Sequence, residues 1–114
     1  MARYEAASVE QIPPGEMISV SLGSEQVLIA NVAGQFYALD DLCPHLAVPL
    51  SQGTLQEACV TCPGHGSEFD LISGDTVKWV GRRPGFLSRI MEGKAHKART
   101  FPIIVENGKL YISV

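Results

Sequence analysis

The sequence lacks a long apolar run and any sign of an export signal. No apolar stretch approaches the roughly 18 residues that a membrane-spanning helix needs, and the longest one, residues 26–33, has the length of a strand and includes Asn31. The N-terminal residues include Arg3 and Glu5 and have no apolar core of the signal-peptide kind. We therefore expect a soluble, cytoplasmic protein without a membrane partner.

The sequence also has little excess of charge. Its net charge is −3, which gives no reason to expect a nucleic-acid partner. The charges are unevenly placed, however: the segment 78–99 holds seven basic residues against Glu92, a net +6, and the rest of the chain has a net −9. Two interpretations stay open, a basic stretch that steers an acidic partner and a merely solvated loop.

Cysteine is scarce, with Cys43, Cys59 and Cys62 as the three in the chain. An odd number does not suit the disulfide framework of a small secreted domain. Cysteines with histidines at short spacings in an intracellular chain indicate a metal site instead. The sequence has no serine in a nucleophile-elbow context and no phosphate-binding glycine-rich loop, so hydrolytic and nucleotide chemistry are not indicated.

The length and the pattern of apolar residues predict one all-β domain. A chain of 114 residues with 46% apolar residues suits a single folded domain. Short alternating runs are punctuated by glycine and proline, and Asn107-Gly108 is a strong type I′ turn signal. We predict an antiparallel sandwich or small barrel with two loops at one end, and one short helix within 85–97. The predicted strands are 17–22, 26–32, 35–39, 58–61, 68–70, 76–79, 99–106 and 109–114.

Two short motifs carry the chemistry. Cys43 and His45 form C-x-H, and Cys62 and His65 form C-x-x-H after a gap of sixteen residues. Two thiolates and two imidazoles suit zinc or an iron–sulfur cluster with mixed ligation. The spacing does not fit a zinc finger, whereas two loops that each present a cysteine and a histidine can hold a [2Fe–2S] cluster from opposite sides. Cys59, in a strand pattern, is predicted to be a buried apolar residue rather than a ligand.

The surroundings of these motifs resemble the Rieske ferredoxins and the Rieske domains of ring-hydroxylating oxygenase systems. The resemblance implies a single Rieske-like domain over 1–114, with two cluster-binding loops within about 40–85 on a β-sandwich base. It also implies one [2Fe–2S] cluster, with the histidines bound through Nδ1. The matching stretches are Cys43-Pro44-His45, Leu50-Ser51-Gln52-Gly53, residues 62–70, Ser73-Gly74 and the terminal hairpin 101–108.

Departures from the family pattern indicate which branch of the family the chain resembles. The Rieske proteins of respiratory complexes carry a loop disulfide at positions that are Val48 and Gly64 here, so the chain resembles the ferredoxin and oxygenase branch. The high-potential branch offers two hydroxyl groups to the cluster sulfurs. Here Ser67 retains one of them, but Phe69 replaces the tyrosine that supplies the other. We predict a reduction potential in the lower half of the Rieske range, which spans roughly −150 to +300 mV.

The resemblance implies a one-electron carrier between a flavin-dependent reductase and a terminal oxygenase, with transient contacts. A mononuclear iron site needs two histidines and a carboxylate. Outside the two motifs only His96 remains, so we expect no substrate site and no enzymatic activity of the chain by itself. Two alternatives stay open: a small subunit of a larger reductase, such as assimilatory nitrite reductase, and a zinc-stapled binding domain.

Overall fold

The computed structural model describes residues 3–42, 49–63, 68–74, 76–78 and 98–114. Within these ranges the chain forms short antiparallel strands and two 3-10 helices, η1 and η2, as the all-β prediction required. The strands of the base are β1 (Arg3–Ser8), β2 (Met17–Leu22), β3 (Glu25–Val32), β4 (Gln35–Asp40), β9 (Thr100–Phe101), β10 (Ile103–Glu106) and β11 (Lys109–Ser113). The remaining elements are η1 (Val9–Gln11), η2 (Leu50–Gln52), β5 (Thr54–Gln56), β6 (Cys59–Thr61), β7 (Glu68–Asp70) and β8 (Thr76–Lys78).

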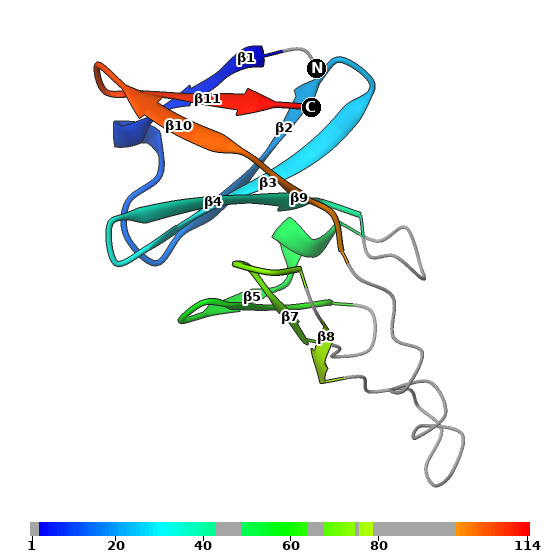
Figure 1. The fold of residues 1–114 in the computed structure, drawn as a ribbon. Helices are drawn as coiled ribbons and strands as arrows, with labels where there is room; N and C mark the ends of the chain where they lie inside the picture. The colour runs from blue at the N-terminus through cyan, green and yellow to red at the C-terminus, as the bar shows by residue number, and fades with distance from the viewer. Residues whose placement is uncertain (1–2, 43–48, 64–67, 75, 79–97) are drawn as a thin grey trace, which may run out of the picture.

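The base consists of two sheets that enclose one core. One sheet has the strand order β1-β11-β10 and the other β2-β3-β4-β9. Figure 1 shows these strands together in one part of the molecule, with β1 and β11 side by side. Their facing side chains form a buried apolar cluster that includes Ile12, Val27, Ile29, Leu110 and Ile112. Burial of these side chains is the main favourable term for the fold.

A smaller sheet, β5-β6-β7-β8, packs below the base and makes a second core. Strand β3 separates the two cores. Val27 and Ile29 face the base core, whereas Leu28 and Ala30 face the second one. Because β3 is buried on both faces, its sequence is a continuous apolar run rather than an alternating one.

The predicted strand 99–106 is two strands in the structure. Pro102 has no backbone N–H to donate, and the chain passes from β9 in one sheet to β10 in the other at this residue. The prediction of one strand was wrong because it treated the proline as part of a single ladder. Strands β1 and β5 were not predicted, and the predicted helix within 85–97 lies outside the described residues.

The predicted turn at Asn107-Gly108 is present, and a second turn with positive φ joins β3 and β4. Asn107 and Gly108 both have positive φ, 52° and 76°, which a type I′ turn requires. At the turn between β3 and β4, Ala33 adopts a φ of 53° and Gly34 one of 92°. The buried Asn31 side chain supports this turn, since its Oδ1 accepts from Gly34 N–H while its Nδ2 donates to Ile12 O, both at 2.8 Å.

Within the ranges that the structure describes, no helix is long and apolar enough to cross a membrane.

Candidate metal centre

The first predicted ligand loop begins and ends at a backbone bridge. Leu42 and Pro49 form an isolated antiparallel bridge, which brings the two ends of the segment 43–48 together. Before the bridge, Asp40 Oδ1 accepts from Leu42 N–H at 3.1 Å and forms the turn that leads into the loop. Cys43 and His45 lie between these ends, outside the described residues.

Asp41 fastens this loop base to the rest of the fold. Its side chain is buried, with Oδ2 accepting from Ser19 Oγ at 2.7 Å and Oδ1 accepting from Ser51 N–H at 2.8 Å. Its backbone N–H donates to Gln26 O, and its carbonyl accepts from Leu50 N–H. One residue therefore joins β2, β3 and η2 at the start of the loop.

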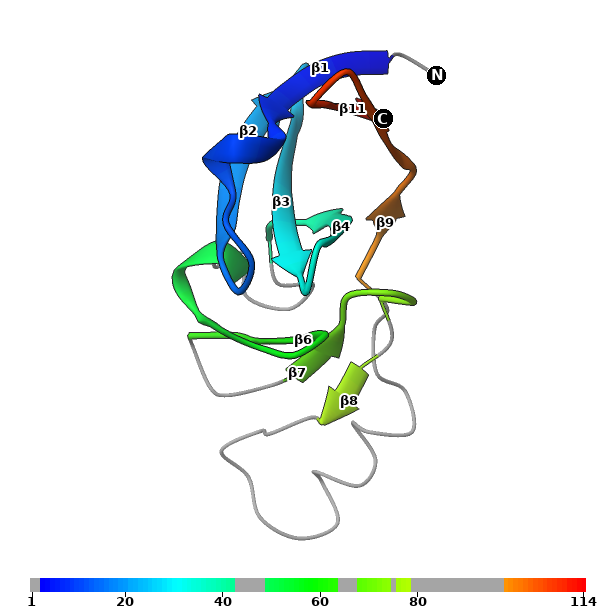
Figure 2. The same ribbon diagram turned by 90° about the vertical axis from the view of Figure 1, so that its left-hand side faces the viewer.

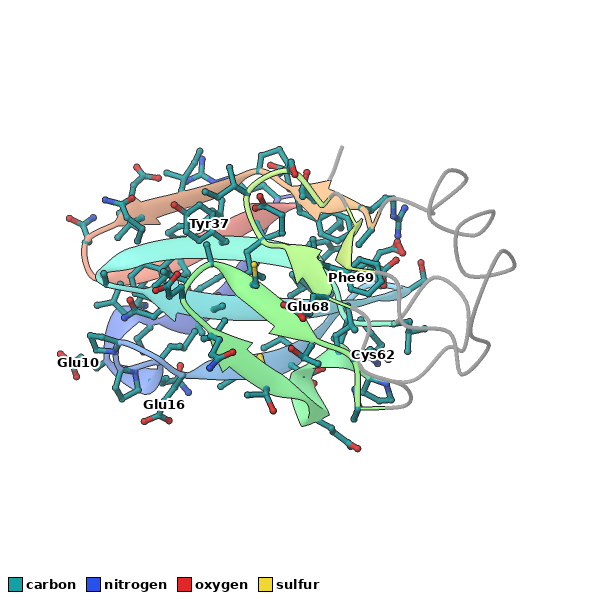
Figure 3. The ribbon with its side chains drawn as sticks, turned by 90° about the horizontal axis from the view of Figure 1, so that it is seen from below. Glu10, Glu16, Tyr37, Cys62, Glu68 and Phe69 are labelled. Carbon is teal, nitrogen blue, oxygen red and sulfur yellow. The ribbon has the colours of Figure 1, made fainter. Side chains whose placement is uncertain are left out.

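The second ligand loop connects β6 and β7. Thr61 pairs with Glu68, so residues 62–67 form the connection of this hairpin. Cys62 is the first residue of the connection and its side chain is only 1% exposed, in the same buried cluster as Leu50 and Phe69. His65 lies within 64–67, outside the described residues. Figure 3 shows Cys62 and Phe69 toward the same end of the molecule, with Glu10 and Glu16 at the other.

A close backbone contact brings the two loop bases together. Gly53 follows η2, and a Cβ atom added to it would lie 1.8 Å from Thr61 O and 3.1 Å from Pro63 Cδ. Thr61 and Pro63 flank Cys62. The exit of the first loop is therefore packed directly against the entry of the second, at a distance that a glycine alone permits.

Sequence reasoning did not assign a role to Gly53 or to the Asp41 carboxylate. The signal for Gly53 was present, because Leu50-Ser51-Gln52-Gly53 belongs to the stretches on which the resemblance rests. For Asp41 the sequence offers only a pair of adjacent aspartates. Its partners Ser19 and Ser51 are 22 and 10 residues away, and they become neighbours only after β2 and η2 have packed.

Cys59 differs from its prediction in one respect. Val60 and Phe69 are paired across β6 and β7 and face the core, so Cys59 and its partner Asp70 face the other way. Cys59 is half-buried rather than buried, which corrects the prediction of a core residue. Partial burial raises the pKa of its thiol, and the negative charges of Asp70, Glu68 and Glu57 raise this pKa further.

The residues present fit a cluster with mixed ligation. Both described cysteines, Cys59 and Cys62, are free thiols. Cys62 is buried at the point where the two loop bases meet, and each loop contributes one cysteine and one histidine in sequence. Two soft sulfur donors and two imidazoles are the ligand set of a Rieske centre. The described residues contain no group of three or more His, Cys, Asp and Glu side chains that could hold a metal ion.

Comparison with known proteins gives the family. A family model for the Rieske [2Fe-2S] domain matches residues 2–102. The chain therefore belongs to the Rieske [2Fe–2S] domain family, as the sequence predicted, and the cofactor of this domain is one [2Fe–2S] cluster.

Two curated relatives show how the domain is used in different contexts. The chain is 35% identical over 104 residues to apoptosis-inducing factor 3 of Homo sapiens, covering 91% of this chain but 15% of that protein. It is 30% identical over 115 residues to the 3-phenylpropionate/cinnamic acid dioxygenase ferredoxin subunit of Escherichia coli K12, covering 100% of this chain and 95% of that subunit. In the first relative the matching region is thus a small part of a longer protein, and in the second it is nearly the whole.

Solved structures confirm the fold class. A ferredoxin of Sphingomonas yanoikuyae B1 has a TM-score of 0.82 at 22% identity, with 99% of each chain covered. A structure described as a complex of reduced oxygenase and oxidized ferredoxin in carbazole 1,9a-dioxygenase has a TM-score of 0.78 at 24% identity, covering 97% and 92%. A putative nitrite reductase small subunit has a TM-score of 0.76 at 18% identity, covering 100% of each. At these identities the likeness shows the fold alone.

Proposed function

We propose that the chain is a one-electron carrier that holds its [2Fe–2S] cluster through Cys43, His45, Cys62 and His65. The two cysteines bind one iron and the two histidines the other, as in the Rieske ligand set. The carrier accepts an electron from a flavin-dependent reductase and passes it to a terminal oxygenase. The domain spans 1–114, with the cluster-binding part within about 40–85.

The observation that carries this proposal is the joining of the two loop bases. The buried Cys62 thiol begins the second loop, and Gly53 brings the end of the first loop against the residues that flank Cys62. This contact supports the proposal that each loop contributes one cysteine and one histidine to a single site. The bound cluster would supply the one-electron chemistry, and the protein would set its potential, its exposure and its docking.

The ferredoxin role is supported by the relatives that the chain covers nearly completely. The Escherichia coli relative is a ferredoxin subunit of a dioxygenase, and a structural neighbour is a ferredoxin bound to its oxygenase. Besides His45 and His65 the chain has His96 alone, so it does not supply the two histidines of a mononuclear iron site, and we propose no substrate site on it. Contacts with the partners are small and transient, as electron-transfer encounters usually are.

Metal and acid-labile sulfide content, measured on protein purified without added metal, tests the ligand assignment. The expected result is two irons and two sulfides per chain, both lost in Cys62→Ala and both retained in Cys59→Ala, the matched control. One zinc and no sulfide in protein prepared anaerobically with iron supplied would instead establish the zinc-stapled domain. A cluster that survives Cys62→Ala would contradict the proposed ligands.

We propose that the basic segment 78–99 helps to dock the redox partner, and electron-transfer kinetics test this role. Arg82 and Arg83, which lie outside the described residues, belong to the basic segment 78–99 and follow the loops in sequence. Replacement of both by glutamate is expected to slow reduction or oxidation by the partner, and the loss is expected to shrink as salt screens the charges. Equal electron-transfer rates of the wild type and the double variant at low salt would contradict a docking role for Arg82 and Arg83. Stable co-purification with a large flavoprotein would favour the reductase-subunit alternative.

A further inference from the structure

Asp41 is a buried carboxylate at the base of the first ligand loop. Its side chain is 3% exposed, and it lies where β4 ends and the chain enters the loop. Both oxygens accept hydrogen bonds, one from the Ser19 hydroxyl and the other from the Ser51 N–H. Acceptance at both oxygens is the pattern of an ionised carboxylate, which has no proton to donate.

This negative charge has no cationic partner among the described residues. The neighbouring Asp40 differs, because its carboxylate forms an ion pair with Arg99 at 3.5 Å, and Arg99 also pairs with Glu25. Within the described ranges the side-chain oxygens of Asp41 accept from two neutral donors, the Ser19 hydroxyl and the Ser51 N–H. A buried charge without a counter-ion acts over a longer range than an exposed one, because little water screens it.

Asp41 joins the segments that flank the first ligand loop and, through η2, contacts the part of the fold that leads into the second. Asp41 is two residues before Cys43, and its hydrogen bonds hold Leu50 and Ser51 at the other end of the first loop. Leu50 shares a buried cluster with Cys62 at the start of the second loop. The helix η2, which Asp41 holds, contacts both β2 and β6 and lies between the base and the smaller sheet (Figures 1 and 2).

From this placement we propose that the buried charge of Asp41 lowers the reduction potential of the cluster that the two loops hold. Reduction adds one electron, and hence one negative charge, at the loops. A fixed negative charge in the same poorly screened region opposes that addition and favours the oxidised state. This inference rests on the proposed function, because it takes the cluster to be held by Cys43, His45, Cys62 and His65.

The direct test is the midpoint potential of Asp41→Asn, measured by spectroelectrochemistry on holoprotein with its iron and sulfide content confirmed. Asparagine has nearly the same shape without the charge. The expected result is a higher potential, with a ratio of reduced to oxidised protein about threefold higher at a fixed applied potential, or about 28 mV at 59 mV per tenfold change in that ratio. The electron paramagnetic resonance spectrum of the reduced state is expected to keep the Rieske g values, which reports an intact ligand set.

Two further variants separate the charge from other effects. Glu16→Gln removes an exposed charge at the end of the molecule opposite Cys62 (Figure 3) and is expected to leave the potential unchanged. Ser19→Ala removes one donor to the Asp41 carboxylate and keeps the charge, so the potential is expected to fall.

Three results would overturn the inference: an unchanged potential in loaded Asp41→Asn, an equal shift in Glu16→Gln, or an unchanged or higher potential in Ser19→Ala. If Asp41→Asn does not assemble a cluster, the potential of Ser19→Ala decides whether the inference holds. Absence of iron and sulfide in the wild-type protein would instead contradict the proposed function.

Discussion

Gly53 and Thr61 are in backbone contact, so close that a Cβ atom on Gly53 would lie 1.8 Å from the Thr61 carbonyl oxygen. Gly53 ends η2, which follows the first ligand loop, and Thr61 ends β6, which leads into the second. Their contact determines how far apart the two loops begin. The relative placement of the predicted ligands therefore depends on a residue that carries no ligand atom.

Substitution of Gly53 by alanine is expected to separate the loop bases. Because the contact is with backbone rather than a flexible side chain, the strand or the loop must move, at a cost of about 1–3 kcal/mol as for other overpacked sites. Iron and sulfide content is expected to fall along with the free energy of unfolding from chemical denaturation.

Gly15→Ala is the matched control. Gly15 has a φ of +86° and nothing within 4 Å of an added Cβ, so alanine there costs about 1 kcal/mol through conformation alone and leaves the cluster content intact. Full cluster occupancy in Gly53→Ala would show that the loop bases tolerate separation.

Phe69 is expected to keep the reduction potential low. Its side chain is fully buried in the apolar core cluster that also contains Cys62, and its ring has no polar hydrogen to donate to a sulfur atom. Phe69→Tyr adds a hydroxyl at the position where the high-potential branch of the family places one, so the midpoint potential is expected to rise. Tyr37→Phe, which removes a hydroxyl from β4, is expected to leave the potential unchanged.

The wild-type value tests the same idea. A wild-type potential in the upper half of the range of roughly −150 to +300 mV would contradict the idea that the potential is low because Phe69 donates no hydrogen bond to the cluster.

Cys59 is expected to react slowly with alkylating agents near pH 9. Partial burial, and next the charge of Asp70, raises the pKa of its thiol, so at any pH below that pKa a smaller fraction is the reactive thiolate. Mass spectrometry of the Cys59 peptide after timed treatment with iodoacetamide measures the rate. We expect a lower rate than for an unstructured cysteine peptide.

Removal of the negative charge of Asp70 is expected to lower the pKa of the Cys59 thiol toward its ordinary value. Asp70→Asn is expected to speed alkylation of Cys59, because its amide oxygen can still accept from Ile72 N–H while the charge is gone. Glu10→Gln, at the end of the molecule opposite Cys62 (Figure 3), serves as the control, because Glu10 is not among the charges that raise the pKa of Cys59. A rate in Asp70→Asn no faster than in the wild type would show that Asp70 does not hold the thiol protonated.

Asn31 is expected to be important for the stability of the base. Its buried amide donates to Ile12 O and accepts from Gly34 N–H, so Asn31→Ala leaves two polar backbone groups without this partner. The free energy of unfolding is expected to fall by about 1–3 kcal/mol. Gln26→Ala, which removes an exposed hydrogen bond to Ser21, is the control and should cost less than about 0.5 kcal/mol.

The sequence by itself determined the family, the cofactor and most of the strands. Alternation along 17–22, the asparagine–glycine turn at 107–108 and the two cysteine–histidine motifs are local patterns, and each reports its own few residues. Pro102 was also visible in the sequence. What it does there, sending β9 and β10 into different sheets, depends on which strands pair with them, and pairing is not a local property.

The tertiary structure alone decided what lies beneath the ligand loops. Gly53 meets Thr61, and Asp41 meets Ser19 and Ser51, because β2, η2 and β6 pack together around the buried side chains of Leu50 and Val60. The exposure of Cys59 was decided in the same way, because pairing of Val60 with Phe69 turned those two inward and Cys59 outward. A sequence pattern predicts which residues can be ligands, whereas packing across distant segments determines the charge and the spacing around them.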